Sequence, residues 1–366
     1  MKIIILSAVL VGMIFTGCNQ KTKNQNDESM TTPLQLTQEW DKVFPKSDKV
    51  DHKKVTFKNG FGITLVADMY TPKKAEGKLA AIAVSGPFGA VKEQSSGLYA
   101  QAMAERGFLT IAFDPSYTGE SDGEPRYVSS PDINTEDFMA AVDFLSLQEN
   151  VDAERIGIIG ICGWGGIALN AAAIDPRIKV TVASTMYDMS RVMQNGYYDA
   201  DDSREKRMAA RKAMAEQRLT DLRNGTNERA GGVVDPLPDD APEFVKQYHA
   251  YYKTPRGYHA RSLNSNEGWL KTSAQPWLNA GFLKFTNEIE GAVMILHGEK
   301  AHSRYFGETA FDNMTGSKHE EGKSTKVGNK QLVIITDATH CDLYDGGEKN
   351  YIPFDQLAEY FTENLR

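Results

Sequence analysis

The stretch from Ile156 to Asn170 constrains the fold more than any other part of this sequence. It begins as a short apolar run typical of a strand and ends as an alanine- and leucine-rich run typical of a helix. Four glycines and one cysteine, Cys162, fill the turn between the two runs. Because glycines let a strand reverse sharply into a helix, the sequence predicts a tight turn that holds the Cys162 side chain above a sheet edge.

This turn has the pattern of a nucleophile elbow. The thiolate is the attacking form of cysteine, and the positive end of a helix is expected to lower the pKa of Cys162. Two alternatives stay open. A free cysteine is often only a small buried hydrophobe. Glycines at every third position from Gly160 also fit loosely a dinucleotide-binding loop, which needs an acidic residue about 20 positions further on, and Asp175 and Asp188 follow.

Length and charge exclude several classes of protein. The chain has 366 residues, 41% hydrophobic and 25% charged, which suits one large α/β domain with an insertion. Its net charge of -8 argues against a nucleic-acid partner, because phosphate binding requires a basic face. No His/Asp/Glu cluster has metal-ligand spacing, so the sequence predicts neither a metal nor a cofactor.

The N-terminus has the pattern of an export signal. Met1 and Lys2 precede the apolar run Ile3–Phe15, which is too short to span a bilayer as a helix. The run ends in Phe15-Thr16-Gly17-Cys18, which resembles a bacterial lipoprotein signal. That resemblance implies a signal peptide over residues 1–17, lipidation of Cys18, a polar tether over residues 18–37, and a lipid anchor facing the periplasm or cell exterior. The alternative is a soluble exported protein.

From Val55 onward the sequence alternates between strand-like and helix-like runs. Two runs, Val55–Lys58 and Phe61–Tyr70, flank Asn59-Gly60 and predict an antiparallel hairpin with a type I′ turn. The alternation that follows predicts a mostly parallel sheet covered on both faces. The further expected strands are Leu79–Ser85, Phe108–Phe113, Arg155–Ile159, Val180–Ser184, Val293–His297 and Gln331–Ile335, and the main expected helices are Ser95–Glu105, Thr135–Leu147, the run after Cys162, and Phe354–Leu365.

Three further motifs follow in a specific order. Ser85–Gly89 ends one predicted strand, Asp114–Ser121 follows the next, and His340 comes after the last. Together with the elbow they resemble an α/β-hydrolase, nearest to the dienelactone-hydrolase-like branch, in which a cysteine can hold the nucleophile position. The resemblance implies an α/β-hydrolase fold, a mostly parallel doubly wound sheet with leading antiparallel strands, within a domain spanning residues 38–366.

The same resemblance assigns catalytic roles. Acyl transfer needs a nucleophile, a base, an orienting acid and two donors for the oxyanion. Cys162 is implied as the nucleophile and His340 as the base. Gly163 follows the nucleophile and is expected to donate its N–H. Because Pro87 has no N–H, Phe88 is expected to supply the second one, with Gly89 as the alternative.

Two loops offer a candidate for the orienting acid. The family places it after the strand Val293–His297, commonly where Ala301 stands here, so Glu299 is the expected acid by proximity. Asp188, after the preceding strand, is the alternative acid. Glu299 could instead be a solvated loop carboxylate, and Asp188 could cap a helix.

A long insertion, about residues 187–289, separates the strands at Val180 and Val293, where α/β-hydrolases carry a helical cap. Its aromatic residues suit either an apolar or ring-shaped acyl group or the core of the cap itself: Tyr248, Tyr251, Tyr252, Tyr258, Trp269 and Trp277. Trp164, where the family has glycine, could line the pocket or pack beneath the elbow helix.

These expectations combine into one functional hypothesis. A membrane-tethered hydrolase would cleave an ester, lactone, thioester or amide of a small molecule through a Cys162 acyl-enzyme, without a cofactor. An acyltransferase with the same residues and a non-catalytic binding lipoprotein are the alternatives. Because Cys341 follows His340 directly, a reversible Cys162–Cys341 disulfide is a further hypothesis.

Overall fold

The computed structural model describes residue 34 and residues 36–366. The predicted signal peptide, Cys18 and most of the tether lie outside these residues, so export and lipidation stay predictions, which fatty-acid labelling that is lost on Cys18→Ser would check. Among the described residues, no helix combines the length and the apolar character needed to cross a membrane.

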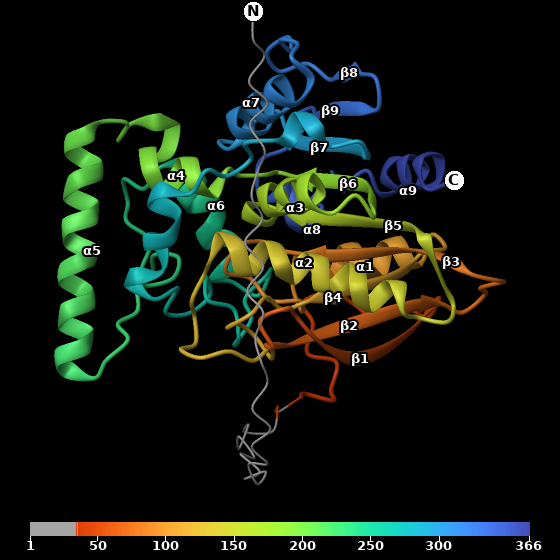
Figure 1. The fold of residues 1–366 in the computed structure, drawn as a ribbon, viewed down its shortest axis with the longest axis horizontal. Coiled ribbons are helices and arrows are strands. Elements are labelled where there is room, and N and C mark those ends of the chain that lie inside the picture. Colours follow the sequence, from red (N-terminus) through yellow and green to blue (C-terminus); the bar gives the residue numbers. More distant parts are fainter. Residues whose placement is uncertain (1–33, 35) are drawn as a thin grey trace, which may run out of the picture. The chain divides into compact units, whose positions relative to one another are not determined.

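A nine-stranded sheet forms the centre of the described residues (Figure 1). Its strands are β1 (Val50–Lys58), β2 (Thr64–Pro72), β3 (Leu79–Ser85), β4 (Leu109–Phe113), β5 (Val151–Ile161), β6 (Ile178–Ser184), β7 (Ala292–Gly298), β8 (Thr325–Val327) and β9 (Lys330–Ile335). They lie in the order β1-β2-β4-β3-β5-β6-β7-β9-β8. The pairs β1/β2, β2/β4 and β8/β9 are antiparallel and the other pairs are parallel. This confirms the predicted mostly parallel sheet with leading antiparallel strands.

Helices cover the sheet because its central strands are apolar along both faces. Outside the insertion the helices are α1 (Ser95–Ala104), α2 (Pro131–Ser146), α3 (Gly163–Ile174), α7 (Arg304–Thr315), α8 (Asp342–Asp345) and α9 (Phe354–Asn364). One group, α2 and α3, packs together on β5, and a second group, α1 and α9, packs on β3, β4 and β6. The sheet therefore fixes where each strand end, and the loop after it, lies.

The first loop differs from its prediction. Lys58 of β1 pairs with Thr64 of β2, so the connection is the five residues from Asn59 to Ile63 and not a two-residue type I′ turn. The side-chain oxygen of Asn59 accepts the N–H groups of Phe61 and Ile63, both at 3.0 Å. Because this side chain satisfies the loop backbone, Asn59 stabilises a longer loop than the Asn-Gly pair predicts.

The chain between β6 and β7, from Thr185 to Gly291, forms the cap. Its helices are α4 (Met189–Asn195), α5 (Arg204–Asn224), α6 (Glu243–Tyr252) and the 3₁₀ segment η2 (Lys271–Asn279). Ser203 caps α5 by accepting the N–H of Lys206 at 3.2 Å, and Gly225 ends it in a left-handed conformation. The cap thus occupies the position that the sequence predicts for the insertion.

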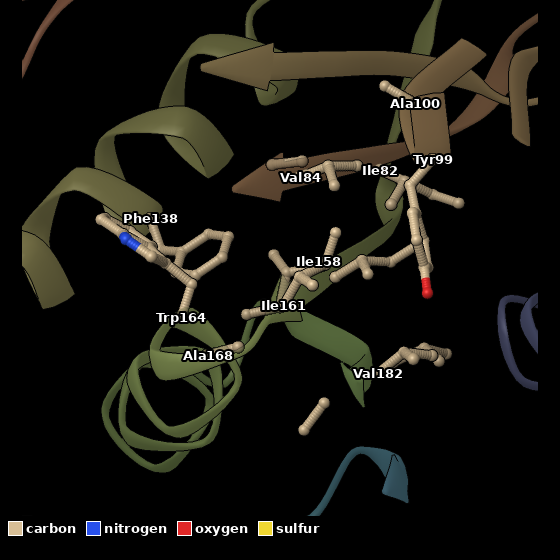
Figure 2. Packing of buried hydrophobic residues seen from close by; sticks show 14 of the residues in the cluster. Ile82, Val84, Tyr99, Ala100, Phe138, Ile158, Ile161, Trp164, Ala168 and Val182 are labelled. Carbon is tan, nitrogen blue, oxygen red and sulfur yellow. The ribbon is translucent and has the colours of Figure 1, made fainter. Parts of the chain in front are cut away.

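Trp164 packs into the core beneath α3. Its side chain is 1% exposed, and its indole meets the rings of Phe113 and Phe138 edge to face at centroid distances of 5.6 and 5.3 Å. Figure 2 shows the indole directed from the start of α3 toward Phe138. Of the two alternatives open from sequence, packing beneath the elbow helix is therefore the one found.

A buried cluster of charged side chains fixes the loop that follows β4. Nζ of Lys92 lies 2.7 Å from Glu93, 2.7 Å from Asp114 and 2.6 Å from Glu120, and all four side chains are at most 2% exposed. The three carboxylates are close enough together to hold a metal ion. In this structure the ammonium group of Lys92 contacts each of them and supplies the compensating positive charge.

Candidate active site

Cys162 occupies the sharp turn between β5 and α3. Its backbone has φ 59° and ψ −128°, a region that residues other than glycine rarely adopt. Three backbone hydrogen bonds hold it there: its N–H donates to Ser184 at 2.9 Å, and its carbonyl accepts from Gly165 at 2.9 Å and Tyr187 at 3.0 Å. The turn therefore has the strained geometry predicted for a nucleophile elbow.

The two expected oxyanion donors lie side by side at the thiol. A Cβ at Gly163 would stand 2.8 Å from Cβ of Phe88, so only glycine lets the elbow approach the loop after β3 this closely. The N–H groups of both residues act to lower the pKa of the Cys162 thiol. Asn264 of the cap donates to the carbonyl of Phe88 at 2.8 Å and so fixes the orientation of that loop.

His340 is fully buried and is held by hydroxyl groups at both ring nitrogens. Nδ1 lies 2.7 Å from the hydroxyls of Thr185 and Ser303, and Nε2 lies 2.9 Å from the hydroxyl of Tyr344. Thr185 has φ 44°, which is strained for a β-branched residue and marks it as a constrained partner. Burial, reinforced by the neighbouring histidines, lowers the pKa of His340 well below its usual value.

Neither candidate acid is hydrogen-bonded to His340 in the described part of the chain. Glu299 is exposed, and its carboxylate accepts the N–H of Asp337 at 2.9 Å. Asp188 caps α4, accepting the N–H of Arg191 at 3.0 Å, as the alternative interpretation holds. The expected Glu299–His340 contact is therefore wrong, because the Glu299 side chain turns toward the loop after β9.

The two loops in which the acid was sought each contribute a hydroxyl instead. Thr185 follows β6 and Ser303 follows β7, which are the two strand ends considered for the acid. Without a carboxylate beside it, the imidazolium form of His340 loses the electrostatic support that an acid gives. The surroundings of His340 therefore favour the neutral form of its imidazole ring.

Several tyrosines at the site were not predicted as functional residues. The hydroxyls of Tyr344 and Tyr248 both act to lower the pKa of the Cys162 thiol, and both side chains line the cavity with it. Tyr344 lies on the short helix α8, four residues after His340, which precedes that helix. Tyr248 comes from α6, and only the fold brings it to the elbow.

The electrostatic environment of the thiol also differs from expectation. Burial raises the pKa of Cys162, although hydrogen bonds to its sulfur act in the opposite direction. The expected lowering by the helix N-terminus is therefore overcome by desolvation. In the resting site both the thiol and the His340 imidazole are neutral at neutral pH.

These shifts predict an unusual pH dependence. Because His340 accepts a proton only when unprotonated and burial lowers its pKa, the rate of Cys162 acylation should stay high well below pH 6.5. In the absence of an acyl substrate, alkylation of Cys162 by iodoacetamide should rise only above pH 9, because burial raises the thiol pKa from that value. Both profiles can be followed by mass spectrometry. Half-maximal acylation at or above pH 6.5 would contradict this account.

A cavity of about 430 Å³ opens onto Cys162. Its aromatic lining comes from the core and the cap: Phe88, Tyr187, Tyr197, Tyr248, Tyr252, Trp269 and Tyr344. The other aromatic residues singled out in the cap divide differently, since Tyr251 and Trp277 are buried outside the cavity lining and Tyr258 is 46% exposed. Of the six residues, Tyr248, Tyr252 and Trp269 therefore line the cavity, and the acyl group that they would suit stays a prediction.

The second cysteine of the described chain is not paired with the first. Cys162 and Cys341 are both buried free thiols, so the hypothetical disulfide is not formed in this structure. Cys341 does not line the cavity.

Comparison with known proteins places this site in a family. The X-Pro dipeptidyl-peptidase S15 family matches residues 61–340, which include both Cys162 and His340. The chain belongs to the S15 family. The family match and the α/β-hydrolase folds described next support membership in the α/β-hydrolase superfamily. Assignment to the dienelactone-hydrolase-like branch stays a prediction.

Two bacterial relatives resemble this S15 chain over most of its length. The uncharacterized protein PA2218 of Pseudomonas aeruginosa is 51% identical, over 98% of this chain and 94% of the length of PA2218. The crystal structure of PA2218 matches this one with a TM-score of 0.84. The uncharacterized protein YcjY of Escherichia coli is 33% identical and covers 86% of this chain and 99% of its own. The α/β-hydrolase GrgF of Penicillium, at 19% identity and a TM-score of 0.67, covers 86% of this chain and 99% of its own and shares the fold.

Two fungal relatives match a shorter part of this S15 chain. Thiohydrolase aneE of Aspergillus aculeatus is 31% identical over 37% of this chain and 42% of its own. Acyltransferase drtE of Aspergillus calidoustus is 30% identical over 46% of this chain and 53% of its own.

Proposed function

We propose that this S15-family protein hydrolyses a thioester or ester of a neutral acyl group through an acyl-enzyme on Cys162. The observation that carries the proposal is the elbow itself: a strained cysteine at the base of a cavity, with the N–H groups of Phe88 and Gly163 at its sulfur. A carbonyl carbon attacked there would leave its oxygen within reach of both donors.

The charge of the cavity favours a neutral acyl group. Among the described residues that line it, Asp201 is the only acidic one, and it pairs with Lys206 at 2.7 Å. The described lining contains no lysine or arginine that could hold a carboxylate or phosphate. The peptide amine of a dipeptidyl-peptidase substrate would need a free carboxylate, so we favour acyl esters and thioesters over peptides.

The state of His340 favours substrates with good leaving groups. Expulsion of an amine needs a general acid, whereas a thiolate leaves with little protonation. Burial lowers the pKa of His340, and among the described residues no carboxylate hydrogen-bonds to it. The imidazolium formed during attack would therefore be high in energy, which favours substrates that demand the least proton transfer. The name of the fungal relative called a thiohydrolase agrees with a thioester substrate.

Trapping the acyl group tests this proposal. We expect p-nitrophenyl acetate or an acyl thioester to acylate the protein once, at Cys162, as seen by intact mass and peptide mapping after an acid quench. Cys162→Ala should lower turnover by at least about 10³-fold, because the nucleophile is lost. Cys341→Ala is the matched control, since it removes a buried thiol outside the cavity lining. Acylation at another residue would overturn the proposal.

The second candidate is acyl transfer to an acceptor other than water, which the name of the relative called an acyltransferase favours. Added alcohols, amines or thiols would then compete with water for the acyl group, and product analysis separates the two activities. If no acyl adduct forms in the wild-type protein, the binding-protein alternative replaces both. We include a lipid anchor at Cys18 in the proposal, which would hold the enzyme at an exported membrane surface.

A further inference from the structure

The hydrogen bonds around His340 leave it no direct link to the nucleophile. Both of its nitrogens contact hydroxyl groups, with Tyr344 at Nε2 and two others at Nδ1. Within the described residues, no hydrogen bond joins the His340 ring to the Cys162 thiol. His340 is fully buried and does not line the cavity. A proton leaving the thiol must therefore cross an intervening group.

Tyr344 is placed between the two. Its hydroxyl lies 2.9 Å from Nε2 of His340, and its ring centroid is 5.1 Å from that of the imidazole. On its other side Tyr344 lines the cavity together with Cys162, and its hydroxyl acts to lower the pKa of that thiol. Its helix α8 is held in place by Tyr99, whose hydroxyl donates to the carbonyl of Leu343 at 2.8 Å.

We propose that Tyr344 is a catalytic residue whose hydroxyl carries the proton from the Cys162 thiol to Nε2 of His340. The inference rests on the proposed function. In the step, the S–H bond breaks as its proton passes to the Tyr344 oxygen, and the former Tyr344 proton passes to Nε2. The electron pair left on sulfur forms the bond to the carbonyl carbon, and the carbonyl π pair moves to the oxygen, which the oxyanion donors hold.

The reverse path completes the balance. When the intermediate collapses, Nε2 returns its proton to Tyr344, and the Tyr344 proton passes to the leaving group. This path requires neutral His340 to carry its hydrogen on Nδ1. Thr185 and Ser303 both offer a hydroxyl oxygen there at 2.7 Å as acceptors for that N–H.

A second chain of hydroxyls starts at the same sulfur and supplies the matched control. The Tyr248 side chain also lines the cavity with Cys162, and its hydroxyl acts to lower the pKa of that thiol. The same hydroxyl lies 2.8 Å from the hydroxyl of Tyr187 and 3.4 Å from Nε2 of His302. Tyr187 itself hydrogen-bonds to His302. Tyr248 thus leads toward His302, whereas Tyr344 leads to His340, and removing either hydroxyl keeps its ring in place.

Single-turnover acylation by p-nitrophenyl acetate separates the two chains. We expect Tyr344→Phe to lower the acylation rate by roughly 10²- to 10³-fold, similar to His340→Ala. The double variant Tyr344→Phe/His340→Ala should lose no more than either single one, because both interrupt one path. In a Tyr248→Phe background, His340→Ala should still cause its full loss. A plot of rate against deuterium content should curve in the wild type and become linear in Tyr344→Phe.

Other outcomes would overturn the inference in distinguishable ways. If Tyr344→Phe acylates at the wild-type rate while His340→Ala does not, the thiol reaches His340 without Tyr344 and the proposed function survives. Additive losses in the double variant would likewise exclude a shared path. Coupling of His340 to Tyr248 in place of Tyr344 would assign the proton to the other chain. If the wild-type protein forms no adduct on Cys162, the proposed function fails and the relay fails with it.

Discussion

Lys92→Met is expected to destabilise the domain by roughly 3–5 kcal/mol, a large fraction of the about 5–15 kcal/mol that stabilises an ordinary domain. The substitution keeps much of the volume of the side chain but removes the positive charge that contacts three buried carboxylates, those of Glu93, Asp114 and Glu120. Burial raises the pKa of Asp114, while the charge of Lys92 opposes that rise. Without Lys92 the carboxylates would repel one another or take up protons.

The destabilisation caused by Lys92→Met should depend on pH, and this dependence would identify the buried charge as its cause. Burial also disfavours the charged form of Glu120, but Lys92 and Lys54 outweigh it and lower the pKa of Glu120 to about 2. The stability supplied by this ion pair is present above the unfolded pKa of the carboxyl and is lost as pH falls toward 2. We therefore expect the destabilisation by Lys92→Met to be larger at pH 8 than at pH 4 in urea denaturation.

Lys300→Met provides the control for Lys92→Met. Lys300 pairs with Asp337 at 2.6 Å, but their side chains are 60% and 51% exposed, so the loss should stay below about 1 kcal/mol. Equal effects of the two substitutions, or a Lys92→Met loss that does not vary with pH, would show that the buried charge is not the cause.

Trp164→Ala is expected to cost about 3–5 kcal/mol of unfolding free energy, because it leaves a large cavity beneath α3 beside Phe113 and Phe138. Trp164→Phe should cost no more than about 2 kcal/mol, since much of the packing remains. The indole N–H also has no hydrogen-bond partner among the described residues, so its removal leaves no partner unsatisfied. Urea denaturation of the two variants measures both values.

Trp269→Ala separates core packing from the cavity. Trp269 is half-buried and packs against Phe88 with tilted rings at a centroid distance of 4.5 Å, so its removal should affect acylation more than stability. The opposite pattern is expected for Trp164→Ala, provided the elbow folds. If Trp164→Phe is as destabilising as Trp164→Ala, the indole N–H contributes in a way that the packing does not explain.

The sequence predicts the sheet and the position of the nucleophile because both depend on the order of strand and helix segments along the chain. Apolar runs of strand length separated by helical runs leave few ways to build a parallel sheet. Cys162 directly follows strand β5, and His340 lies in the loop after strand β9. Topology alone brings these two positions to one edge of the sheet.

The acid could not be predicted because the direction of a loop side chain is not encoded in its distance along the sequence. Glu299 and Ser303 lie in the same short segment after β7, yet only Ser303 turns inward to His340. The prediction also considered only carboxylates as partners of His340 and therefore missed the hydroxyl group of Thr185. The failed type I′ turn at Asn59 has a similar origin, since its side chain rather than its backbone preference sets the loop length.

The attachment of the cap has a consequence for how this lineage can diversify. Although the cap leaves the sheet after β6 and returns at β7, these strands pair directly, from Val180 with Ala292 to Ser184 with Leu296. A descendant could therefore lengthen, shorten or replace much of the cap without breaking the pairing between β6 and β7. The hydrogen bond between Asn264 and Phe88 would limit such change, because it joins the cap to the loop that carries an expected oxyanion donor.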